Sequence, residues 1–455
     1  MIYSNIMVLL PEIFLAVLAL SVQTLGVFTK SSRAASYLAL LGIVGVIFAM
    51  TIHNSDYVAF GGSYTSDECT SLFKLLVLGV TTLVIMTYIG HTKNQQSEYL
   101  TLILLSSLGS CIAISARDLI LLFVGLELAA LSGYMLACFK RDSIKSSEAG
   151  LKYFVLGALA SCLILLGMSF LYGFSGSTSY VVLAQITEQE TINIGIIVGG
   201  MLLLSGLMFK MSAAPFHFWT PDVYEGAPII SVSFFASSQK LGVLAVLIVM
   251  LVYIQPSNEF SIALRVAAIL SMLVGSIGAL IQESIKRLMA YSTILNVGFA
   301  FIPLVTFGEN GWVISMTYLV IYAISTIGLF ALLGLALGDK ADDGQLKDLS
   351  GLSSEHKILA AFISILIFSM IGLPPMAGFF GKYYVLYNAV ENKEYLLAAA
   401  GLLSSLIAAY YYLRIIKAIY FEESTSKEKI AAINPMTSIV VIITLGFTLL
   451  FWVVS

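Results

Sequence analysis

The stretch LMFKMSAAPFHFWTPDVYEGAP, Leu207–Pro228, decides the fold of this chain. It begins inside a long apolar segment and carries Lys210 where a bilayer is driest. Pro215 follows five positions later and lacks the N–H that would continue a helix undisturbed. A charge near mid-membrane costs about 3 kcal/mol on insertion scales and by default marks a pathway or a binding site. The stretch therefore predicts a broken transmembrane helix with a functional lysine.

The composition is that of an integral membrane protein. Of 455 residues, 59% are hydrophobic and 11% are charged, and the mean hydropathy is +0.96. Soluble domains carry about 25% charged residues. The net charge of -3 is nearly neutral and gives no reason to expect a nucleic-acid partner. A soluble enzyme and a nucleic-acid-binding protein are both excluded.

The sequence carries no motif for a bound cofactor or metal. Its four cysteines and four histidines are dispersed along the chain. No glycine-rich dinucleotide motif, phosphate-binding loop, haem motif or iron–sulfur spacing is present. We expect no cofactor-binding residues and no metal site in this chain, so any redox cofactors would sit elsewhere.

The apolar segments predict an all-α integral membrane fold. A span needs about 20 apolar residues, and on that criterion we count about fourteen transmembrane helices. They are expected near 4–28, 35–53, 71–90, 98–115, 118–138, 148–172, 192–213, 228–254, 261–282, 288–307, 312–337, 357–378, 395–420 and 434–454.

The basic residues predict the orientation of these spans. Sixteen of the Lys and Arg residues fall in loops and span ends after odd-numbered spans, and only Lys74, Arg117, Arg265 and Lys393 fall on the opposite side. Because Lys and Arg concentrate in cytoplasmic loops, both termini are expected outside. The sixteen are Lys30, Arg33, Lys93, Lys140, Arg141, Lys145, Lys152, Lys286, Arg287, Lys340, Lys347, Lys357, Arg414, Lys417, Lys427 and Lys429.

A faint internal repeat organises the chain. Phe209–Pro215 breaks a span beside a lysine, and Gly372–Gly378 does the same ahead of Lys382. Interrupted spans at corresponding positions of two halves are typical of transporters built of inverted repeats. We therefore predict a single membrane domain over 1–455, made of an N-terminal three-helix segment (1–97), two inverted five-helix repeats (98–254 and 261–420) that each hold a broken helix, and a C-terminal helix (434–454).

Glu127 is the expected partner of Lys210. It lies several residues inside its span, where a lone carboxylate would tend to protonate. Near Glu127, Lys210 would keep its proton, and with Glu127 drawn away burial would favour release of that proton. The alternative is an ion pair that only fixes helix packing, or a lysine that reaches the interface at a span end.

Two further lysines lie within or beside spans. Lys240 follows Ser237, Ser238 and Gln239, so water could reach it and it could relay protons between the halves. Hydrogen bonding to those hydroxyls for packing is the alternative. Lys382 follows a double proline, where opened helix ends expose backbone groups. There the alternative is a span that ends early and leaves the lysine at the interface.

Four more residues are candidates for proton relay. His217 could pass protons near neutral pH, although a hydrogen-bonded histidine in the turn after Pro215 is the alternative. Lys286 and Tyr291 lie at an inward loop, where anchoring by basic residues accounts for Lys286. Lys152 is four residues after Glu148 and could simply pair with it.

Six motifs, in order along most of the chain, resemble a known family. They are LPEIFL (Leu10–Leu15), GLEL (Gly125–Leu128), EAGLKYFVLGA (Glu148–Ala158), FKMSAAPFHFWTPDVYEGAP (Phe209–Pro228), IKRLMAYSTI (Ile285–Ile294) and GLPPMAGFFGK (Gly372–Lys382). The chain resembles the antiporter-like membrane subunits of respiratory complex I, the proton-translocating NADH–quinone oxidoreductase. The DVYEGAP portion favours the subunit N family, and lysine at 382 speaks against subunit M.

The resemblance implies fourteen helices and a role as a subunit of an enzyme, with no NADH site or redox cofactor of its own. Electron transfer from NADH to quinone would occur in partner subunits that hold flavin and iron–sulfur clusters, and it would drive proton pumping here. Subunit M and small subunits such as K are the implied partners, besides membrane lipid, in a hetero-oligomer of the bacterial plasma (inner) membrane, with periplasmic termini. Glu127 resembles the carboxylate that pairs with the lysine at position 210. Lys240 resembles the bridging lysine of the family, and Lys382 resembles its terminal lysine.

One departure and two rival functions remain. The family often has a histidine in the stretch that here reads Ser292–Gly298, with Asn296 in its place, and asparagine cannot titrate. A subunit of a multi-subunit cation/proton antiporter would share the fold and the lysines but would lack redox partners. A structural scaffold would have no need of costly intramembrane charges.

Overall fold

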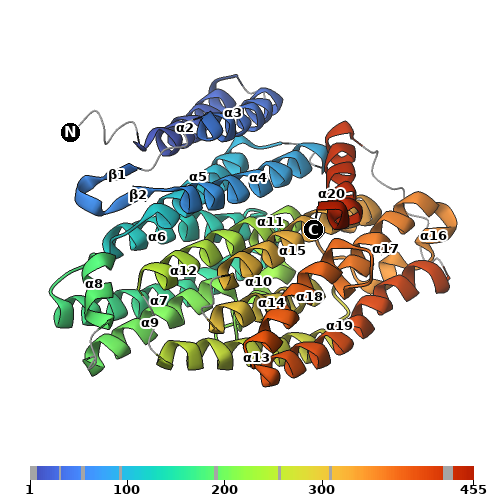
Figure 1. Ribbon diagram of the computed structural model, residues 1–455. Helices are drawn as coiled ribbons and strands as arrows, with labels where there is room; N and C mark the ends of the chain where they lie inside the picture. The colour runs from blue at the N-terminus through green and yellow to red at the C-terminus, as the bar shows by residue number, and fades with distance from the viewer. Residues whose placement is uncertain are drawn as a thin grey trace.

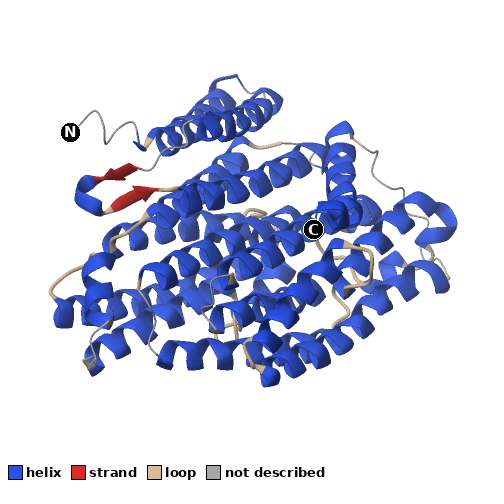
Figure 2. Ribbon diagram, in the orientation of Figure 1, coloured by secondary structure: helices blue, strands red, loops and turns tan. Residues whose placement is uncertain are grey.

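The computed structural model describes residues 8–29, 32–52, 57–91, 95–188, 193–254, 258–306, 310–423 and 434–454. Four of the basic residues behind the predicted orientation, Lys30, Lys93, Lys427 and Lys429, lie outside these ranges. The described chain is a helical bundle with one small β-hairpin, in agreement with the predicted all-α membrane fold (Figures 1 and 2).

Thirteen helices of the described ranges are long and apolar enough to cross a membrane. Helices suit this setting because they satisfy their own backbone hydrogen bonds where lipid offers none. The thirteen are α2 (Leu10–Thr29), α3 (Ser32–Ile52), α4 (Glu68–His91), α5 (Ser97–Ser115), α6 (Leu119–Ala137), α7 (Ile144–Ser175), α9 (Ile194–Met211), α11 to α12 (Ile229–Phe234 and Lys240–Tyr253, joined by a π-helical turn, Phe235–Gln239), α13 (Asn258–Leu280), α14 (Ile285–Val305), α15 (Gly311–Leu337), α19 (Tyr395–Phe421) and α20 (Pro435–Val454).

The remaining predicted span, the twelfth (357–378), is shorter than expected. Its helix, α17 (Lys357–Ile371), ends where Gly372 adopts φ 93°, and α18 (Ala377–Glu391) begins after Pro374 and Pro375. Prolines cannot donate the hydrogen bonds that would continue the helix, so the segment splits in two. Other short elements were not predicted: α8 (Tyr180–Thr187), α10 (Trp219–Gly226), α16 (Leu352–Glu355) and the hairpin of β1 (Tyr57–Ala59) and β2 (Tyr64–Ser66).

Helices α5 and α6 approach each other closely because glycines meet at their crossing. A methyl group on Gly109 would lie 2.5 Å from the amide nitrogen of Ala129, and one on Gly125 would lie 2.6 Å from that of Ala113. Small residues at such crossings let helix backbones pack tightly within a membrane. The contact fixes the position of α6, the helix that carries Glu127.

The first two helices, α2 and α3, lie along one edge of the bundle, and α20 packs against α4 and α15 (Figure 1). The predicted repeats cover α5 to α12 and α13 to α19. Their inverted relationship stays a prediction.

The connections gather at two ends of the bundle. At one end, isolated β-bridges join Tyr64 to Ala116 and Asp118 to Ser179. At the other, a bridge joins Ser284 to Gln345, and Lys140 pairs with Asp342. The loops expected on one side of the membrane therefore gather at one end of the bundle, and those expected on the other side gather at the other end.

Candidate functional site

The first broken helix is α9, which ends one residue after Lys210. Ser212 adopts φ 64° and closes the helix, and a cis bond joins Ala214 to Pro215. The amide nitrogen of Ala214 donates to Ser271 Oγ of α13 at 2.8 Å. The break is thereby attached to the second half of the chain.

Lys210 and Glu127 form an ion pair, as the sequence predicted. Lys210 Nζ lies 3.2 Å from Glu127 Oε1, and the side chains are 10% and 22% exposed. The same carboxylate oxygen accepts a hydrogen bond from Ser161 Oγ of α7 at 2.5 Å. Glu127 is thus held between α9 and α7 and has a second partner that would remain if Lys210 lost its charge.

Lys240 closes the end of the helix that carries Lys210. Its Nζ donates to the main-chain oxygen of Lys210 at 2.9 Å and to Ser212 Oγ at 2.6 Å. It also lies 4.9 Å from the centroid of the Trp219 ring, and the residue is 1% exposed. Lys240 follows directly on the π-helical turn, a distortion that is frequent at functional sites.

A small cavity adjoins Lys210. Its volume is about 30 Å³, which is room for a water molecule. Polar lining residues are Ser110, Tyr134, Tyr153, Lys210 and Gln239, and apolar residues of α5, α6, α9 and α12 complete it. Gln239 also donates to Ser106 Oγ of α5 at 3.3 Å. Lys210 and Gln239, the residue before Lys240, therefore line the same cavity.

The second break repeats this arrangement. Lys382 Nζ donates to the main-chain oxygen of Ile371, the last residue of α17, at 2.9 Å. It also donates to Ser405 Oγ at 3.0 Å and lies 5.5 Å from the centroid of the Phe299 ring. The residue is 7% exposed. At each break a buried lysine therefore satisfies a carbonyl that the interrupted helix leaves without an N–H.

Buried polar side chains of α14 form hydrogen bonds with α15 and α19. Asn296, 4% exposed, donates to the main-chain oxygen of Ser292 at 2.7 Å and accepts from Tyr318 Oη at 2.6 Å. Ser292 Oγ lies 2.5 Å from Tyr412 Oη. The asparagine is therefore part of a hydrogen-bonded group, one turn from the phenylalanine beneath Lys382.

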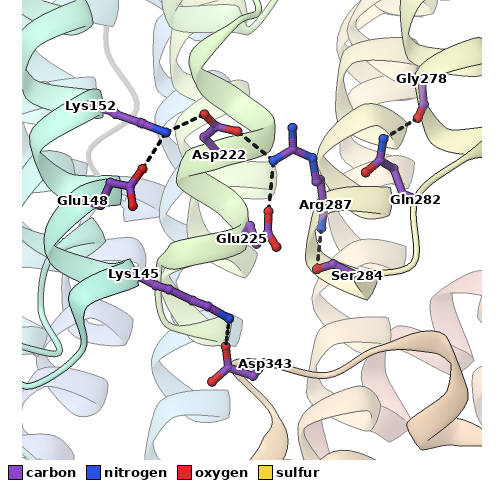
Figure 3. A network of polar contacts seen from close by, with 10 residues as sticks. All are labelled: Lys145, Glu148, Lys152, Asp222, Glu225, Gly278, Gln282, Ser284, Arg287 and Asp343. Atoms are coloured by element: carbon purple, nitrogen blue, oxygen red, sulfur yellow. Dashed lines mark hydrogen bonds and ion pairs between the residues drawn. The ribbon is translucent and has the colours of Figure 1, made fainter.

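A charged cluster at α10 joins the two halves (Figure 3). Asp222 pairs with Lys152 of α7 at 2.8 Å and with Arg287 of α14 at 2.7 Å, and Arg287 also pairs with Glu225 at 2.9 Å. Burial raises the pKa of the Asp222 carboxyl, but the hydrogen bonds from Lys152 and Arg287 outweigh burial and hold that pKa below its ordinary value. Lys152 does pair with Glu148, at 2.8 Å, but it also has this longer-range partner.

The other relay candidates make different contacts from Lys210, Lys240 and Lys382. Lys286 is 2% exposed and donates to the main-chain oxygen of Ala227 at 2.7 Å, so it is a buried residue rather than an interfacial anchor. Tyr291 packs its ring against Gly278 of α13. His217 lies in the turn between α9 and α10, half-buried beside Phe218.

One buried ion pair was missed from the sequence. Lys74 Nζ of α4 lies 2.6 Å from Glu12 Oε1 of α2, and the side chains are 2% and 5% exposed. Lys74 lies near the start of its span, as the sequence predicted, but its burial and its pairing with Glu12 were not predicted. The available signal was that two opposite charges, Glu12 and Lys74, each fall a few residues inside an apolar segment.

Comparison with known proteins places the chain among membrane subunits. The profile of the family described as NADH:quinone oxidoreductase/Mrp antiporter, TM, matches residues 116–408. The NADH-quinone oxidoreductase subunit N of Rickettsia felis is 43% identical over 426 residues, covering 92% of this chain and 93% of that protein.

Solved structures share the fold. A chain of respiratory complex I from Thermus thermophilus with bound Aureothin superposes with a TM-score of 0.82 at 30% identity, covering 98% of both chains. A chain of the Mrp complex from Dietzia sp. has a TM-score of 0.83 at 19% identity, covering 97% of this chain and 94% of that one. At that identity the second likeness concerns the fold alone.

Proposed function

Because this chain belongs to the subunit N family of NADH-quinone oxidoreductase, as its motifs predicted, we propose that it translocates protons in the membrane arm of that complex. It is a subunit of a multi-subunit enzyme, and the NADH–quinone chemistry belongs to partner subunits that hold the flavin and the iron–sulfur clusters. The observation that carries the proposal is the buried pair of Lys210 and Glu127 at a broken helix, closed by Lys240.

The first proton step involves Glu127. While its carboxylate stays 3.2 Å from Lys210, the ammonium form of the lysine is stabilised. When the carboxylate moves away from Lys210 and keeps its hydrogen bond from Ser161, Lys210 stays buried and loses its counter-charge, so its proton leaves. The adjoining cavity offers a place for the water that accepts that proton.

Transfer then proceeds along the line of buried lysines. Lys240 receives the proton beside the carbonyl of Lys210, and Lys382 is the terminal carrier at the second break. The hydroxyls of Ser292, Tyr318 and Tyr412 are the proposed intermediates, because they can both donate and accept. Asn296 cannot titrate, so in this chain it positions hydroxyls rather than carrying the proton.

The remaining predicted residues fit subsidiary roles. Lys152 and Lys286, at the end of the bundle where the α10 cluster lies, are candidates for proton uptake. His217, in the turn after α9, and Tyr291, in α14, complete the set of proposed relay residues.

The family suggests the membrane in which the chain resides, its orientation and its neighbouring subunits. We propose that the chain resides in the bacterial plasma (inner) membrane with both termini on the periplasmic side, as the distribution of basic residues favours. Subunit M and small subunits such as K are its proposed neighbours. Cation/proton exchange is the rival function, but the 43% identity favours the oxidoreductase, whereas the Mrp likeness supports only a shared fold.

The decisive experiment is gentle purification of the tagged chain from its membranes, followed by mass spectrometry and an NADH–quinone assay. Flavin- and iron–sulfur-bearing partners with inhibitor-sensitive activity are expected. Recovery of small antiporter subunits without redox activity would overturn the oxidoreductase assignment and move the function to cation/proton exchange.

A further inference from the structure

A second buried ion pair lies in the N-terminal segment, outside both predicted repeats. Lys74 Nζ is 2.6 Å from Glu12 Oε1 and 2.9 Å from Tyr64 Oη, and it lies 5.0 Å from the centroid of the Tyr64 ring. Glu12 is in the first turn of α2, and Lys74 is in the second turn of α4. The pair therefore lies near one end of the bundle, beside the β-hairpin.

This pair is shorter and more buried than the one at the broken helix. The Glu12 and Lys74 side chains are 5% and 2% exposed, against 22% and 10% for Glu127 and Lys210. Burying two charges is expensive even when they pair, and helix packing alone is served as well by apolar side chains. Among the described residues, Glu12 Oε2 is buried without a hydrogen-bond partner. The carboxylate thus keeps a free acceptor that a purely structural pair would be expected to satisfy.

Glu12 also lines a groove that is open to the surface. Its volume is about 710 Å³, and Glu12, Tyr64 and Leu108 are among its lining residues, most of which are apolar. Ser63 and Asp118 line it as well, and both belong to connections between the spans rather than to the spans themselves. A carboxyl group at Glu12 therefore shares one cavity with polar side chains at the end of the bundle.

Helix α4 also reaches towards the central lysines. Thr81 Oγ1 lies 2.7 Å from Ser238 Oγ, two residues before Lys240, and 3.1 Å from Ser107 Oγ of α5. Thr81 is seven residues after Lys74, two turns along the same face, or about 10 Å of helix. Through Thr81 and Lys74, helix α4 therefore contacts both the region beside Lys240 and Glu12.

We propose that Glu12 and Lys74 are a second proton-exchanging pair, which passes protons between the central lysines and the end of the bundle at Asp118. The ammonium of Lys74 gives its proton to the Glu12 carboxylate, leaving a neutral amine and a carboxylic acid. The acid releases that proton along the groove, and the amine takes up another from the α4 side, so charge and protons balance. The inference rests on the proposed proton-translocating function.

The test uses the whole complex in inverted membrane vesicles, with turnover, protons moved per NADH and assembly on native gels as readouts. Glu12→Gln is expected to lower proton-coupled turnover by about tenfold, within the range for losing a proton-transfer group, while Glu12→Asp keeps most of it. Lys417→Met, at an exposed lysine, is the matched control.

The swapped variant Glu12→Lys with Lys74→Glu separates the two roles. It restores opposite charges to the same two helices but moves the carboxyl away from the groove, so assembly without normal pumping is expected. Wild-type pumping in the swapped variant, or in an assembled Glu12→Gln, Lys74→Met double variant, would overturn the inference. Lys210→Ala in parallel reports on the proposed function: its failure to reduce pumping would reject that function, whatever the Glu12 variants do.

Discussion

The Nζ of Lys240 donates to the main-chain oxygen of Lys210 at 2.9 Å, so one buried lysine closes the helix that carries another. The contact joins α12 to α9 at the point where α9 is interrupted. Any change in the charge or position of Lys240 therefore acts on the last turn of the helix that holds the Lys210–Glu127 pair.

Removing either charge of the Lys210–Glu127 pair should impair turnover more than a substitution that keeps the charge. Lys210→Ala and Glu127→Ala are each expected to lower NADH–quinone turnover by about tenfold or more, because the proton carrier or its counter-charge is lost. Lys210→Arg and Glu127→Asp keep the charges and should retain more activity. Turnover in membranes with native-gel assembly checks this, and full activity in an assembled alanine variant would contradict it.

Lys240→Met should weaken both stability and activity. It removes the donor to the Lys210 carbonyl and to Ser212 Oγ, and a buried acceptor left without a partner costs about 1–3 kcal/mol. Thermal inactivation of the purified complex measures this loss. Ser212→Ala, which removes only one acceptor, should lower the midpoint less; an equal or larger effect would mean that the carbonyl contact matters little.

Lys382→Met should behave like Lys240→Met at the second break. It removes the donor to the Ile371 carbonyl and to Ser405 Oγ. We expect lower turnover together with an earlier thermal midpoint. If the midpoint falls while turnover per assembled complex stays normal, Lys382 serves the broken helix and carries no proton.

Gly125→Ala should destabilise the crossing of α5 and α6. The added methyl would lie 2.6 Å from the amide nitrogen of Ala113, and overpacking of this kind costs about 1–3 kcal/mol. Because Glu127 is two residues further on, turnover should fall as well. Gly45→Ala is the control, since a methyl at Gly45 meets no atom within 4 Å. Equal thermal midpoints for the two variants would refute the close packing.

Asp222→Asn should remove a pH-dependent contribution to stability. The pKa of Asp222 is lowered from its ordinary value in the folded chain, because the hydrogen bonds from Lys152 and Arg287 outweigh burial. Its stabilisation is therefore present above about pH 4 and is lost as the pH falls through the lower folded value. Thermal midpoints at pH 7 should differ between wild type and variant, and should converge in acid and at high salt.

The lysine line could be predicted from sequence because isolated charges in apolar segments are rare. Lys210, Glu127 and Lys382 needed only their positions in the spans and the neighbouring prolines. The sequence could not show that Lys240 would contact the Lys210 backbone, since that contact depends on how α12 meets the end of α9. The fold class and thirteen of the fourteen predicted spans followed from hydropathy, whereas α10 did not, because its eight residues are too few and too polar to be recognised as a span.

Charges near span ends were the main source of error. Lys74 and Lys286 each lie within seven residues of a helix start, where sequence alone cannot separate burial from exposure to the interface. The structure buries both, Lys74 against Glu12 and Lys286 against a backbone carbonyl. Long-range partners decided the outcome in each case, and such partners leave no local pattern.

The placement of Trp219 has an optical consequence. Its indole donates to the main-chain oxygen of Phe209, stacks on Tyr153 with 4.3 Å between ring centroids, and lies beneath the ammonium of Lys240. Only two other tryptophans occur in the chain, Trp312 and Trp452. With both replaced by phenylalanine, the fluorescence of this subunit would come from a single chromophore beside the buried lysine, and its emission would follow the charge there during turnover.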